Sequence, residues 1–427
     1  MLKDYRETLD YLYQSLPMFQ RIGAAAYKPD LNNTIALCAA IGNPQNKFKL
    51  IHVAGTNGKG STSHMLAATL QSAGYKTGLY TSPHLKEFTE RIRIDGHEVE
   101  QQFVVDFMNR IQPVIDRIKP SFFELTVAMA FQYFVERKVD VAVIEVGVGG
   151  RLDSTNVISP ELSVITNISF DHKDLLGDTL PKIASEKAGI IKRGTPVVVS
   201  ERQKEVEEVF IEKAKSCNAT ISFASDAVEL HPSQNGYNIL VDGKIWMENL
   251  NPELKGIYQR KNIPGVVASV IKLREIGYSI SEESVRRGIE HCADLTGLKG
   301  RWQKIGTHPL IICDTGHNQA GISEVLTQIR QTPHQKLHMV FGVVKDKDVG
   351  DVVKMLPQDA HYYFCQAKIP RAQDAAVLAD MARAEGLKGD VIPDVNQAIA
   401  AAKRNAAPED LVFIGGSTFV VAEVDGL

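Results

Sequence analysis

One segment of the sequence, residues 48–74, combines an apolar run, a glycine-rich loop and a helical pattern in an order that few folds use. FKLIHVAG indicates a buried strand, and STSHMLAATLQSAG indicates a helix that ends at Gly74. Between them, GTNGKGS places three glycines within six residues, with Lys59 among them. Glycine lets backbone N–H groups turn toward phosphate oxygens, and the N-terminus of the next helix adds the positive end of its dipole. The segment therefore predicts a phosphate-binding loop in an α/β domain, in preference to a plain glycine-rich turn.

The loop departs from the common pattern G-x-x-x-x-G-K-[ST], in which a hydroxyl residue follows the lysine directly. Here Gly60 follows Lys59, and Ser61 comes one place later. Lys59 is expected to meet the β and γ phosphates as a point charge. The displaced serine does not remove the prediction, because a magnesium ligand can come from another part of the chain.

The composition is that of a globular protein and gives no hint of the chemistry. Of 427 residues, 44% are hydrophobic and 23% are charged, and the net charge is −3. That balance argues against a nucleic-acid surface or a polybasic membrane patch, and no apolar run approaches the ~20 residues that span a bilayer. The stretch 1–16 is amphipathic and acidic, unlike a signal peptide. Five scattered cysteines without CxxC spacing predict reduced thiols, a cytoplasmic location and no zinc site.

Short β-rich runs alternate with helical patterns along most of the chain, which predicts an α/β fold with largely parallel strands. The segment 228–250 differs, because the turn signals QNG and DG separate alternating runs and indicate antiparallel hairpins. A polar, glycine-rich stretch at 293–306 precedes a second α/β series. We therefore expect a large N-terminal P-loop ATPase domain at 1–297 and a smaller, Rossmann-like C-terminal domain at 298–427. Such pairs of domains commonly bind their ligands in the cleft between them.

Polar residues follow two further strand patterns, at the strand ends where ligands of parallel sheets usually lie. The carboxylate of Glu145, at the end of DVAVIE, suits Mg²⁺, although a solvated loop acid explains it equally well. His172 follows ELSVITNI; a packing or surface histidine is the commoner case, and a role beside Glu145 requires the sheet to pair those two strands. Lys187, in IASEKAGI, is compatible with a helical surface lysine, and the residues alone give it no special role.

In the second domain, CDTGHNQAG lies at a strand end that leads into a helix, and it presents Asp314, His317 and Asn318 together. Such a cluster could bind a ribose, a substrate carboxylate or an attacking amine; the alternative is a structural turn with an Asx cap. Arg301, in GRW near the link between the domains, could reach a nucleotide phosphate or ring.

Taken together, these segments resemble the folylpolyglutamate synthase/dihydrofolate synthase family, which is related to the Mur peptidoglycan ligases. GTNGKGS is similar to that family's phosphate-binding loop, with glycine and then serine after the lysine. Further family motifs follow in order over nearly the whole chain: YTSPHL, FTERIRI, FFELT, EVGVGGRLDSTN, ITNISFDH, LG, IASEKAGI, KGIYQRKN, GR and CDTGHN. Three segments depart from the usual forms: CDTGHNQ replaces LDGAHNP, Tyr258-Gln259 replaces HQ, and GSTFVVAEV replaces a GSLYLVG-like ending.

The resemblance implies roles for individual residues. The residues expected to contact ATP are Asn57, Gly58, Lys59, Gly60, Ser61, Asn262, Arg301 and Asp314. The expected magnesium ligands are Ser82, Glu145 and His172, and Lys187 matches a lysine that is carbamylated in these ligases. The residues expected to bind the pterin-containing substrate are Phe123, Glu124, Leu152, Asp153 and Ser154, and those expected to position glutamate are His317 and Ser417. Catalysis is expected to depend on Lys59, Lys187, Asp314 and His317.

The activity that the resemblance implies is an ATP-dependent amide ligase of folate metabolism. Its partners would be ATP, L-glutamate, and dihydropteroate or a reduced folate, and the protein is expected to act as a monomer, without nucleic acid or membrane. A Mur-type ligase of UDP-sugar peptides is the alternative among enzymes, against which FTERIRI and FFELT argue. A P-loop switch without ligase activity would need a guanine-reading [NT]KxD motif, and the sequence contains none. Dihydrofolate synthase, folylpolyglutamate synthase and the combination of both activities are all compatible with these motifs.

Overall fold

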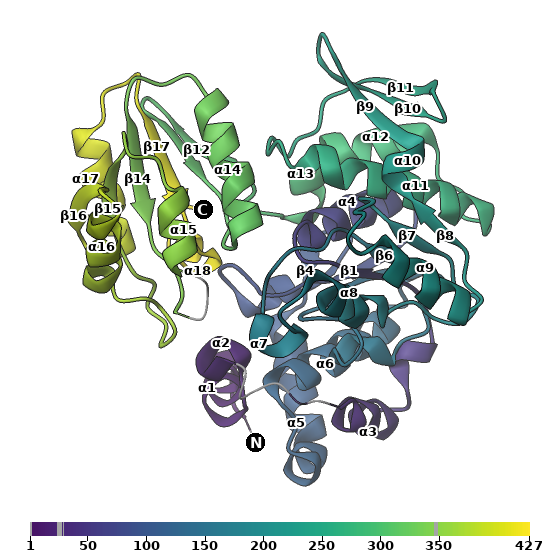
Figure 1. The fold of residues 1–427 in the computed structure, drawn as a ribbon. Coiled ribbons are helices and arrows are strands. Elements are labelled where there is room, and N and C mark those ends of the chain that lie inside the picture. The colour runs from purple at the N-terminus through teal and green to yellow at the C-terminus, as the bar shows by residue number, and fades with distance from the viewer. Residues whose placement is uncertain (1, 24–27, 29, 346–348) are drawn as a thin grey trace. The chain divides into compact units, whose positions relative to one another are not determined.

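The computed structural model describes residues 2–23, 28, 30–345 and 349–427 of the chain. Those residues form two compact units, which are drawn in Figure 1. The first unit comprises Met1–Glu253 and Gln259–Leu298, and the second comprises Leu254–Tyr258 and Lys299–Leu427. The short segment Leu254–Tyr258 falls inside the range expected for the N-terminal domain, yet it packs with the second unit.

The first unit is built on an eight-stranded sheet in the order β4-β3-β2-β5-β1-β6-β7-β8. The strands are β1 (Lys49–Ala54), β2 (Thr77–Tyr80), β3 (Ile92–Ile94), β4 (His97–Glu98), β5 (Val141–Glu145), β6 (Leu162–Ile165), β7 (Val197–Val199) and β8 (Ile221–Phe223). β3 pairs antiparallel with β2 and β4, and the other pairs are parallel. This order places β1, which leads into the phosphate-binding loop, between β5 and β6.

Helices cover the sheet of this unit, and for that reason its central strands are apolar at almost every position. β5, β6 and β7 are buried throughout, and β1 is buried from its second residue onward. The helices are α1 (Tyr5–Ser15), α2 (Phe19–Ile22), α3 (Asn32–Ala40), α4 (Lys59–Ser72), α5 (Gln101–Ile118), α6 (Phe122–Glu136), α7 (Lys173–Leu176), α8 (Leu180–Ala188), α9 (Glu207–Ser216), α10 (Ala224–Ala227), α11 (Gln259–Glu275), α12 (Glu282–Glu290) and α13 (Cys292–Thr296). α4 contacts the sheet as well as α11 and α12, so ten consecutive residues of this helix are buried, Ser61 to Leu70.

The predicted antiparallel hairpins are confirmed as a separate three-stranded sheet in the first unit. Its strands are β9 (Val228–Ser233), β10 (Gly236–Val241) and β11 (Lys244–Leu250), in the order β11-β10-β9. Both pairs are antiparallel, and each turn falls on a predicted turn signal.

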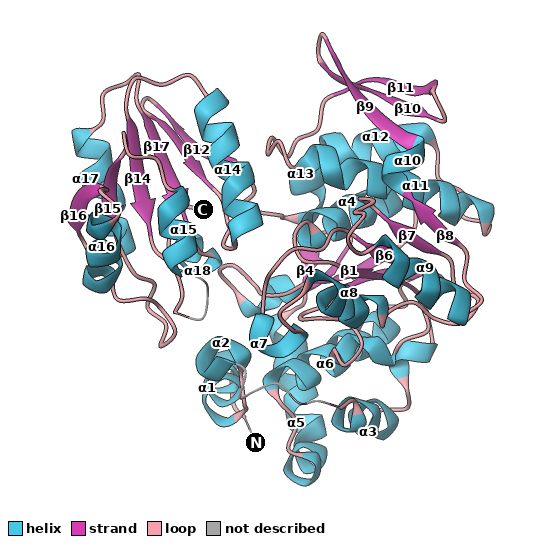
Figure 2. Ribbon diagram, in the orientation of Figure 1, coloured by secondary structure: helices cyan, strands magenta, loops and turns pink. Residues whose placement is uncertain are grey.

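The second unit carries a six-stranded sheet in the order β12-β13-β17-β14-β15-β16, antiparallel only between β12 and β13. The strands are β12 (Gln303–Thr307), β13 (Leu310–Cys313), β14 (Leu337–Phe341), β15 (His361–Phe364), β16 (Lys388–Val391) and β17 (Leu411–Gly415). The helices are α14 (Gln319–Gln331), α15 (Val349–Met355), α16 (Ala375–Ala384), α17 (Val395–Asn405) and α18 (Thr418–Ala422), shown with their sheet in Figure 2. The connections through α14, α15 and α16 each lead toward β16, whereas the connection through α17 leads from β16 back to β17, in the opposite direction across the sheet. Since such crossovers are right-handed, α17 lies on the opposite face.

The predicted fold class, a large α/β domain with a mostly parallel sheet and a smaller α/β domain, is confirmed. In the smaller unit, the apolar core is formed between the sheet and the row of α14, α15 and α16. Within the described ranges, none of the helices combines the length and the apolar character that a membrane span needs.

Candidate active site

The phosphate-binding loop joins β1 to α4 with a backbone that glycine adopts most easily. Gly55 has φ 146°, and Gly58, the N-cap of α4, has φ 84°. A Cβ at Gly55 would lie 1.8 Å from Thr166 Oγ1, and a Cβ at Gly58 would lie 2.2 Å from Asn262 Oδ1. Both glycines are therefore required by the backbone conformation and by the close approach of Thr166 and Asn262.

The residues that follow β6 hold this loop in place. Thr166 Oγ1 donates to Asn57 O (2.6 Å), and Asn57 N donates to Asn167 Oδ1 (3.0 Å). Thr56 N donates to Asn167 O (2.8 Å), and Asn57 Nδ2 donates to Ser169 Oγ (3.0 Å). This support was not predicted from the sequence, although the polar run directly after β6 is a signal for it. The loop conformation is therefore fixed by the protein itself.

Two lysine side chains reach carbonyl oxygens of the same loop. Lys59 Nζ lies 3.1 Å from Thr56 O, and Lys187 Nζ, from the C-terminal turn of α8, lies 2.8 Å from Gly55 O. Lys187 is only 4% exposed, which excludes the surface lysine that the sequence alone allowed. Burial and then the charge of Lys59 lower the pKa of Lys187 from 10.5 to about 7. A large share of Lys187 is therefore an uncharged amine at neutral pH, which is the nucleophilic form.

Two of the three predicted magnesium ligands, Ser82 and Glu145, lie together at the C-terminal ends of β2 and β5. Ser82 N, after β2, donates to Glu145 Oε2 at the end of β5 (3.1 Å), and Glu145 is 5% exposed. His172, after β6, is the N-cap of α7; its backbone N–H bonds Asp171 Oδ1 (2.9 Å), and its ring contacts the Phe19 ring edge-on. β5 and β6 do not pair with each other, since β1 lies between them. Glu145 and His172 thus follow the two strands that flank the phosphate-binding strand, and the role of His172 as a ligand stays a prediction.

The chemistry of the Ser82–Glu145 pair suits magnesium rather than a metal that needs several protein ligands. Among the residues that the structure describes, no group of three or more His, Cys, Asp or Glu side chains is arranged to hold a metal ion. Mg²⁺ is usually bound by one or two carboxylates, with water and substrate phosphates completing six oxygen ligands. The carboxylate of Glu145 and the hydroxyl of Ser82, beside a phosphate-binding loop, fit that requirement.

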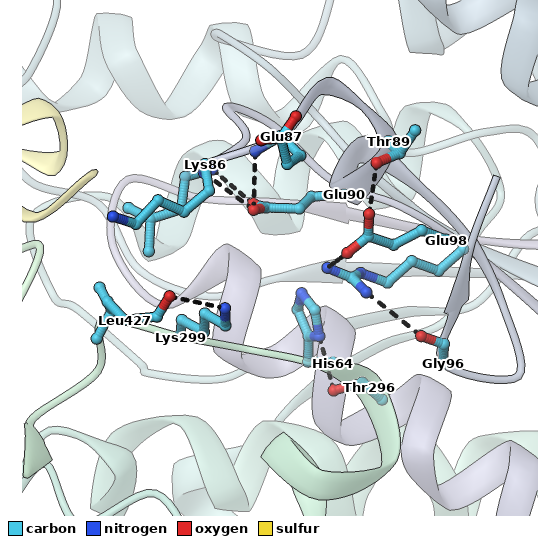
Figure 3. A network of polar contacts seen from close by, with 12 residues as sticks. His64, Lys86, Glu87, Thr89, Glu90, Gly96, Glu98, Thr296, Lys299 and Leu427 are labelled. Carbon is cyan, nitrogen blue, oxygen red and sulfur yellow. Dashed lines mark hydrogen bonds and ion pairs between the residues drawn. The ribbon is translucent and has the colours of Figure 1, made fainter. Parts of the chain in front are cut away.

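The loop that follows Ser82 is held by one carboxylate. Glu90 accepts hydrogen bonds from the backbone N–H groups of Leu85 (2.7 Å), Lys86 (2.9 Å) and Glu87 (3.0 Å). Figure 3 shows Glu90 with Lys86 and Glu87 beside it. This gives a physical role to Glu90 of the FTERIRI motif, which was not visible in the sequence.

Two residues expected at the pterin-containing substrate, Phe123 and Glu124, begin α6. The Phe123 ring packs against the loop after β5, since a Cβ at Gly147 would lie 2.6 Å from it. Glu124 is 2% exposed and belongs to a capping box, in which its Oε2 accepts from Ser121 N (2.6 Å). Its other oxygen, Oε1, is buried and has no hydrogen-bond partner within the described part of the chain. A buried acceptor of this kind suits a ligand that brings N–H donors.

Asp153, also expected at that substrate, is buried in its own loop. Its oxygens accept from Val148 N (2.9 Å), Thr155 N (3.0 Å) and Thr155 Oγ1 (2.6 Å). Burial raises its pKa, and these hydrogen bonds oppose that rise. Because Thr155 Oγ1 donates to Asp153, it accepts from His52 Nε2 (2.8 Å), and burial lowers the pKa of His52 to about 3. The neighbouring predicted residues, half-buried in the same loop, are Leu152 and Ser154.

In the second unit, Asp314 follows β13 and forms the centre of a buried cluster. Its Oδ2 accepts from Tyr258 OH (2.5 Å) and Trp302 N (2.7 Å), and its Oδ1 accepts from Gly316 N (2.8 Å). Burial raises the pKa of Asp314, whereas the bond from Tyr258 lowers it. Tyr258, which replaces the usual histidine, therefore ties the segment Leu254–Tyr258 to β13.

The other predicted residues of this unit lie around the same edge of the sheet. Arg301 Nη1 donates to the hydroxyl of Thr315, and His317 Nδ1 is 3.1 Å from Thr315 O. Ser417 follows β17, which pairs with β13, and its Oγ caps α18 by accepting from Phe419 N (3.1 Å). The structure thus brings Arg301, Asp314 and His317 together near one strand end. Asn318 is the N-cap of α14, as the Asx alternative predicted, and its Oδ1 accepts from Gly321 N.

Comparison with known proteins identifies the family. The Mur ligase middle domain matches residues 53–270, and the Mur ligase glutamate ligase domain matches residues 300–418. The chain belongs to the Mur ligase family. Within that family it belongs with the folylpolyglutamate synthases: it is 33% identical to the dihydrofolate synthase/folylpolyglutamate synthase of Bacillus subtilis, over 93% of this chain and 94% of that protein.

Two solved members of the Mur ligase family extend the likeness to the whole fold. Escherichia coli FolC in complex with DHPP and ADP is 28% identical, with a TM-score of 0.86 over 98% of this chain and 96% of that one. A bifunctional folylpolyglutamate synthase/dihydrofolate synthase with Mn, AMPPNP and L-glutamate bound is also 28% identical, with a TM-score of 0.84 over 98% and 97% of the two chains. The predicted family is therefore confirmed, and it is one of ATP-dependent ligases.

Proposed function

We propose that this chain is an ATP-dependent ligase that adds L-glutamate to dihydropteroate, to the γ-carboxylate of reduced folates, or to both. The observation that carries the proposal is the pair of lysines, Lys59 and Lys187, on the carbonyl oxygens of a preformed phosphate-binding loop. The cation of Lys59 at the N-terminus of α4 favours a polyanionic ligand, and the lowered pKa of the buried Lys187 reflects its burial and the same positive charge. The Ser82–Glu145 pair at the neighbouring strand ends supports a nucleotide that carries magnesium.

The reaction that fits this site proceeds in two steps. A carboxylate oxygen of the pteroate or folate attacks the γ-phosphorus of ATP, so that the bond to the β-phosphate oxygen breaks and ADP leaves. The amine of glutamate then attacks the carbonyl carbon of the acyl phosphate, loses a proton, and inorganic phosphate leaves. The protein contributes position and charge neutralisation, because two anions must meet in the first step.

The predicted site residues of the first unit have proposed roles in that reaction. The backbone N–H groups of Gly58, Gly60 and Ser61 would bind phosphate oxygens beside Asn57, and Lys59 Nζ would turn from Thr56 O toward the β and γ phosphates. Magnesium, held by Glu145 and Ser82 with His172 as the predicted third ligand, would offset the charge of the phosphates. A carbamate on Lys187 would supply an anion to that metal site. The buried amine supports this modification, because its lowered pKa leaves a share of it uncharged at neutral pH.

The remaining residues would bind the other groups of the substrates. Asn262, Arg301 and Asp314 are proposed for the nucleoside of ATP, and His317 and Ser417 for glutamate. The pterin is proposed to bind at the start of α6, where Glu124 Oε1, a buried acceptor without a hydrogen-bond partner in the described part of the chain, could accept from its N–H groups. The other residues proposed for the pterin are Phe123, Leu152, Asp153 and Ser154. We also propose that the enzyme acts as a monomer in the cytoplasm, where the five free cysteines fit a reducing environment.

Radiolabelled glutamate incorporation tests the proposal directly. Purified protein is given ATP, Mg²⁺ and labelled glutamate with dihydropteroate in one reaction and a reduced folate in another, and a Lys59→Ala variant serves as control. Incorporation in both reactions supports both activities, and incorporation in one selects it. No incorporation in either, with ADP still bound, would overturn the folate assignment. Incorporation with a UDP-sugar peptide instead would favour the Mur-type alternative.

A further inference from the structure

Gln259, the first residue of α11, contacts the first turn of α4 at the phosphate-binding loop. Its Nε2 lies 3.1 Å from Ser61 Oγ, and the two residues are 198 positions apart in the sequence. Gln259 is 2% exposed and Ser61 is 1% exposed, so water does not compete for this bond.

A second hydrogen bond sets the direction of the first. Asn262 Nδ2 donates to Gln259 Oε1 (2.8 Å), so the amide of Gln259 presents its N–H to Ser61. Ser61 Oγ then accepts one hydrogen bond and keeps its own O–H to donate. Among the residues that the structure describes, Ser61 Oγ has no other hydrogen-bond partner. The hydrogen bonds therefore run from Asn262 through Gln259 to Ser61, and the Ser61 O–H remains as a donor.

We propose that Gln259 is a positioning residue that makes the Ser61 hydroxyl an acceptor toward Gln259, so that its O–H is kept as a hydrogen-bond donor to a nucleotide phosphate. In the common loop, the hydroxyl follows the lysine directly and serves the metal. In this loop the hydroxyl is one residue further on, which rotates it about 100° around the helix. There it meets Gln259 from α11. The displaced serine thus becomes a phosphate donor, and the proposed metal ligands are Glu145, Ser82 and His172.

This inference rests on the proposed function, since it assumes that a nucleotide occupies the loop. The competing explanation is that Gln259 only packs α11 against α4. The neighbouring Asn262 makes such a packing contact, because it lies close to Gly58 at the start of α4. The two explanations differ in one respect. Positioning acts through the Ser61 hydroxyl, so it requires that hydroxyl to be present, whereas packing does not.

A double-mutant cycle on ADP affinity separates these explanations. ADP binding with Mg²⁺ is measured by calorimetry for the wild type, Ser61→Ala, Gln259→Met, and the double variant. Hydrogen bonds to charged groups are the strong ones, so we expect Ser61→Ala to weaken ADP binding about tenfold or more. Gln259→Met should weaken it several-fold in the wild-type background and have almost no effect once Ser61 is alanine.

The Gln259→Glu variant tests the direction of the bond at nearly constant size. A carboxylate accepts the Ser61 O–H and turns its proton away from the phosphates, so ADP should bind more weakly than in Gln259→Met. If Gln259→Met does not fold, Gln259→Glu replaces it in the cycle. Gln45→Leu is the matched control, because Gln45 is 8% exposed in the same unit and, within the described part of the chain, hydrogen-bonds only to the nearby Asn43. The ADP affinity of this variant should equal that of the wild type.

An equal loss of ADP affinity from Gln259→Met with and without the Ser61 hydroxyl would overturn the inference, as would no loss at all. Failure of the wild type itself to bind ADP would instead overturn the proposed function. The thermal midpoint of each variant is recorded in parallel, because a purely structural role lowers that midpoint without the dependence on Ser61.

Discussion

The side-chain nitrogen of Lys187 lies 2.8 Å from the carbonyl oxygen of Gly55, and this bond connects α8 to the first glycine of the phosphate-binding loop. The amine is buried and close to Lys59, and both conditions lower its pKa, to about 7. An amine forms a carbamate only when uncharged: its nitrogen attacks the carbon of CO₂ and releases a proton. The environment of Lys187 thus favours the modification that the family resemblance implies.

Loss of the Lys187 amine should strongly reduce ligation. We expect Lys187→Ala to reduce glutamate incorporation by about a hundredfold or more, because an anion near the metal and a hydrogen bond to the loop are both lost. Short carboxylic acids should restore part of the activity by replacing the carbamate. The control is Lys182→Ala, on the exposed side of α8, which should keep wild-type activity. Full activity of Lys187→Ala would remove Lys187 from the mechanism.

The depressed pKa of Lys187 also predicts how stability depends on pH. Between about pH 7 and 10.5, the folded state has lost the Lys187 proton, whereas the unfolded state still binds it. Stability should therefore rise with pH across that window, relative to a variant without this amine. The measurement compares thermal midpoints of the wild type and Lys187→Met from pH 6.5 to 10 in CO₂-free buffer. Parallel curves for the two proteins would show that the pKa is not depressed.

Lys59 should be required for both nucleotide binding and ligation. Lys59→Ala removes the positive charge expected at the β and γ phosphates, so incorporation should fall to background and ADP should bind about tenfold or more weakly. Lys59 is half-buried with one bond to Thr56 O, so the thermal midpoint should change little. Near-normal incorporation by a folded Lys59→Ala protein would show that the phosphate site lies elsewhere.

A pair of glycine substitutions can separate backbone strain from steric exclusion. Gly58 and Gly74 both have positive φ, of 84° and 90°, but a Cβ at Gly58 meets Asn262 Oδ1 at 2.2 Å, whereas Gly74 has open space. We expect Gly58→Ala to eliminate ADP binding, because Asn262 or the loop must move. Gly74→Ala should lower the thermal midpoint slightly and leave ADP binding intact. Equal ADP affinities in both variants would mean that the Asn262 contact is not important.

The strands, the loop and the hairpins were predictable because their signals are local. Apolar runs next to glycine and polar turns mark β1 and its loop, and QNG and DG mark the turns around β10. The family motifs added the residues at strand ends, such as Glu145 and Asp314. Periodicity and turn chemistry act within a few residues, so a single sequence carries them directly.

The contacts that build the site were not predictable, because they join distant positions. Nothing local indicates that β1 lies between β5 and β6, or that Gln259 reaches Ser61 across 198 residues. The support of the loop by Thr166 and the burial of Lys187 depend on the same strand order. For Lys187 in particular, a helical lysine beside a glutamate indicates a surface position, and only the fold shows that it is buried.

Tyr258 offers the last prediction, since it replaces the usual histidine and donates to the buried Asp314 (2.5 Å). In Tyr258→Phe, Asp314 Oδ2 keeps the bond from Trp302 N but loses the one from Tyr258. The carboxylate is then less stabilised, and its pKa, already raised by burial, rises further. A carboxyl with a raised pKa destabilises the folded state as pH rises, because the folded protein then has to ionise a buried group. The loss in stability, about 1–3 kcal/mol at neutral pH, should therefore shrink toward acidic pH. Thermal midpoints at pH 4.5 and 7.5 measure this, with Tyr237→Phe on β10 as the control. A deficit that does not change with pH would show that the Tyr258 hydroxyl does not act through the Asp314 carboxylate.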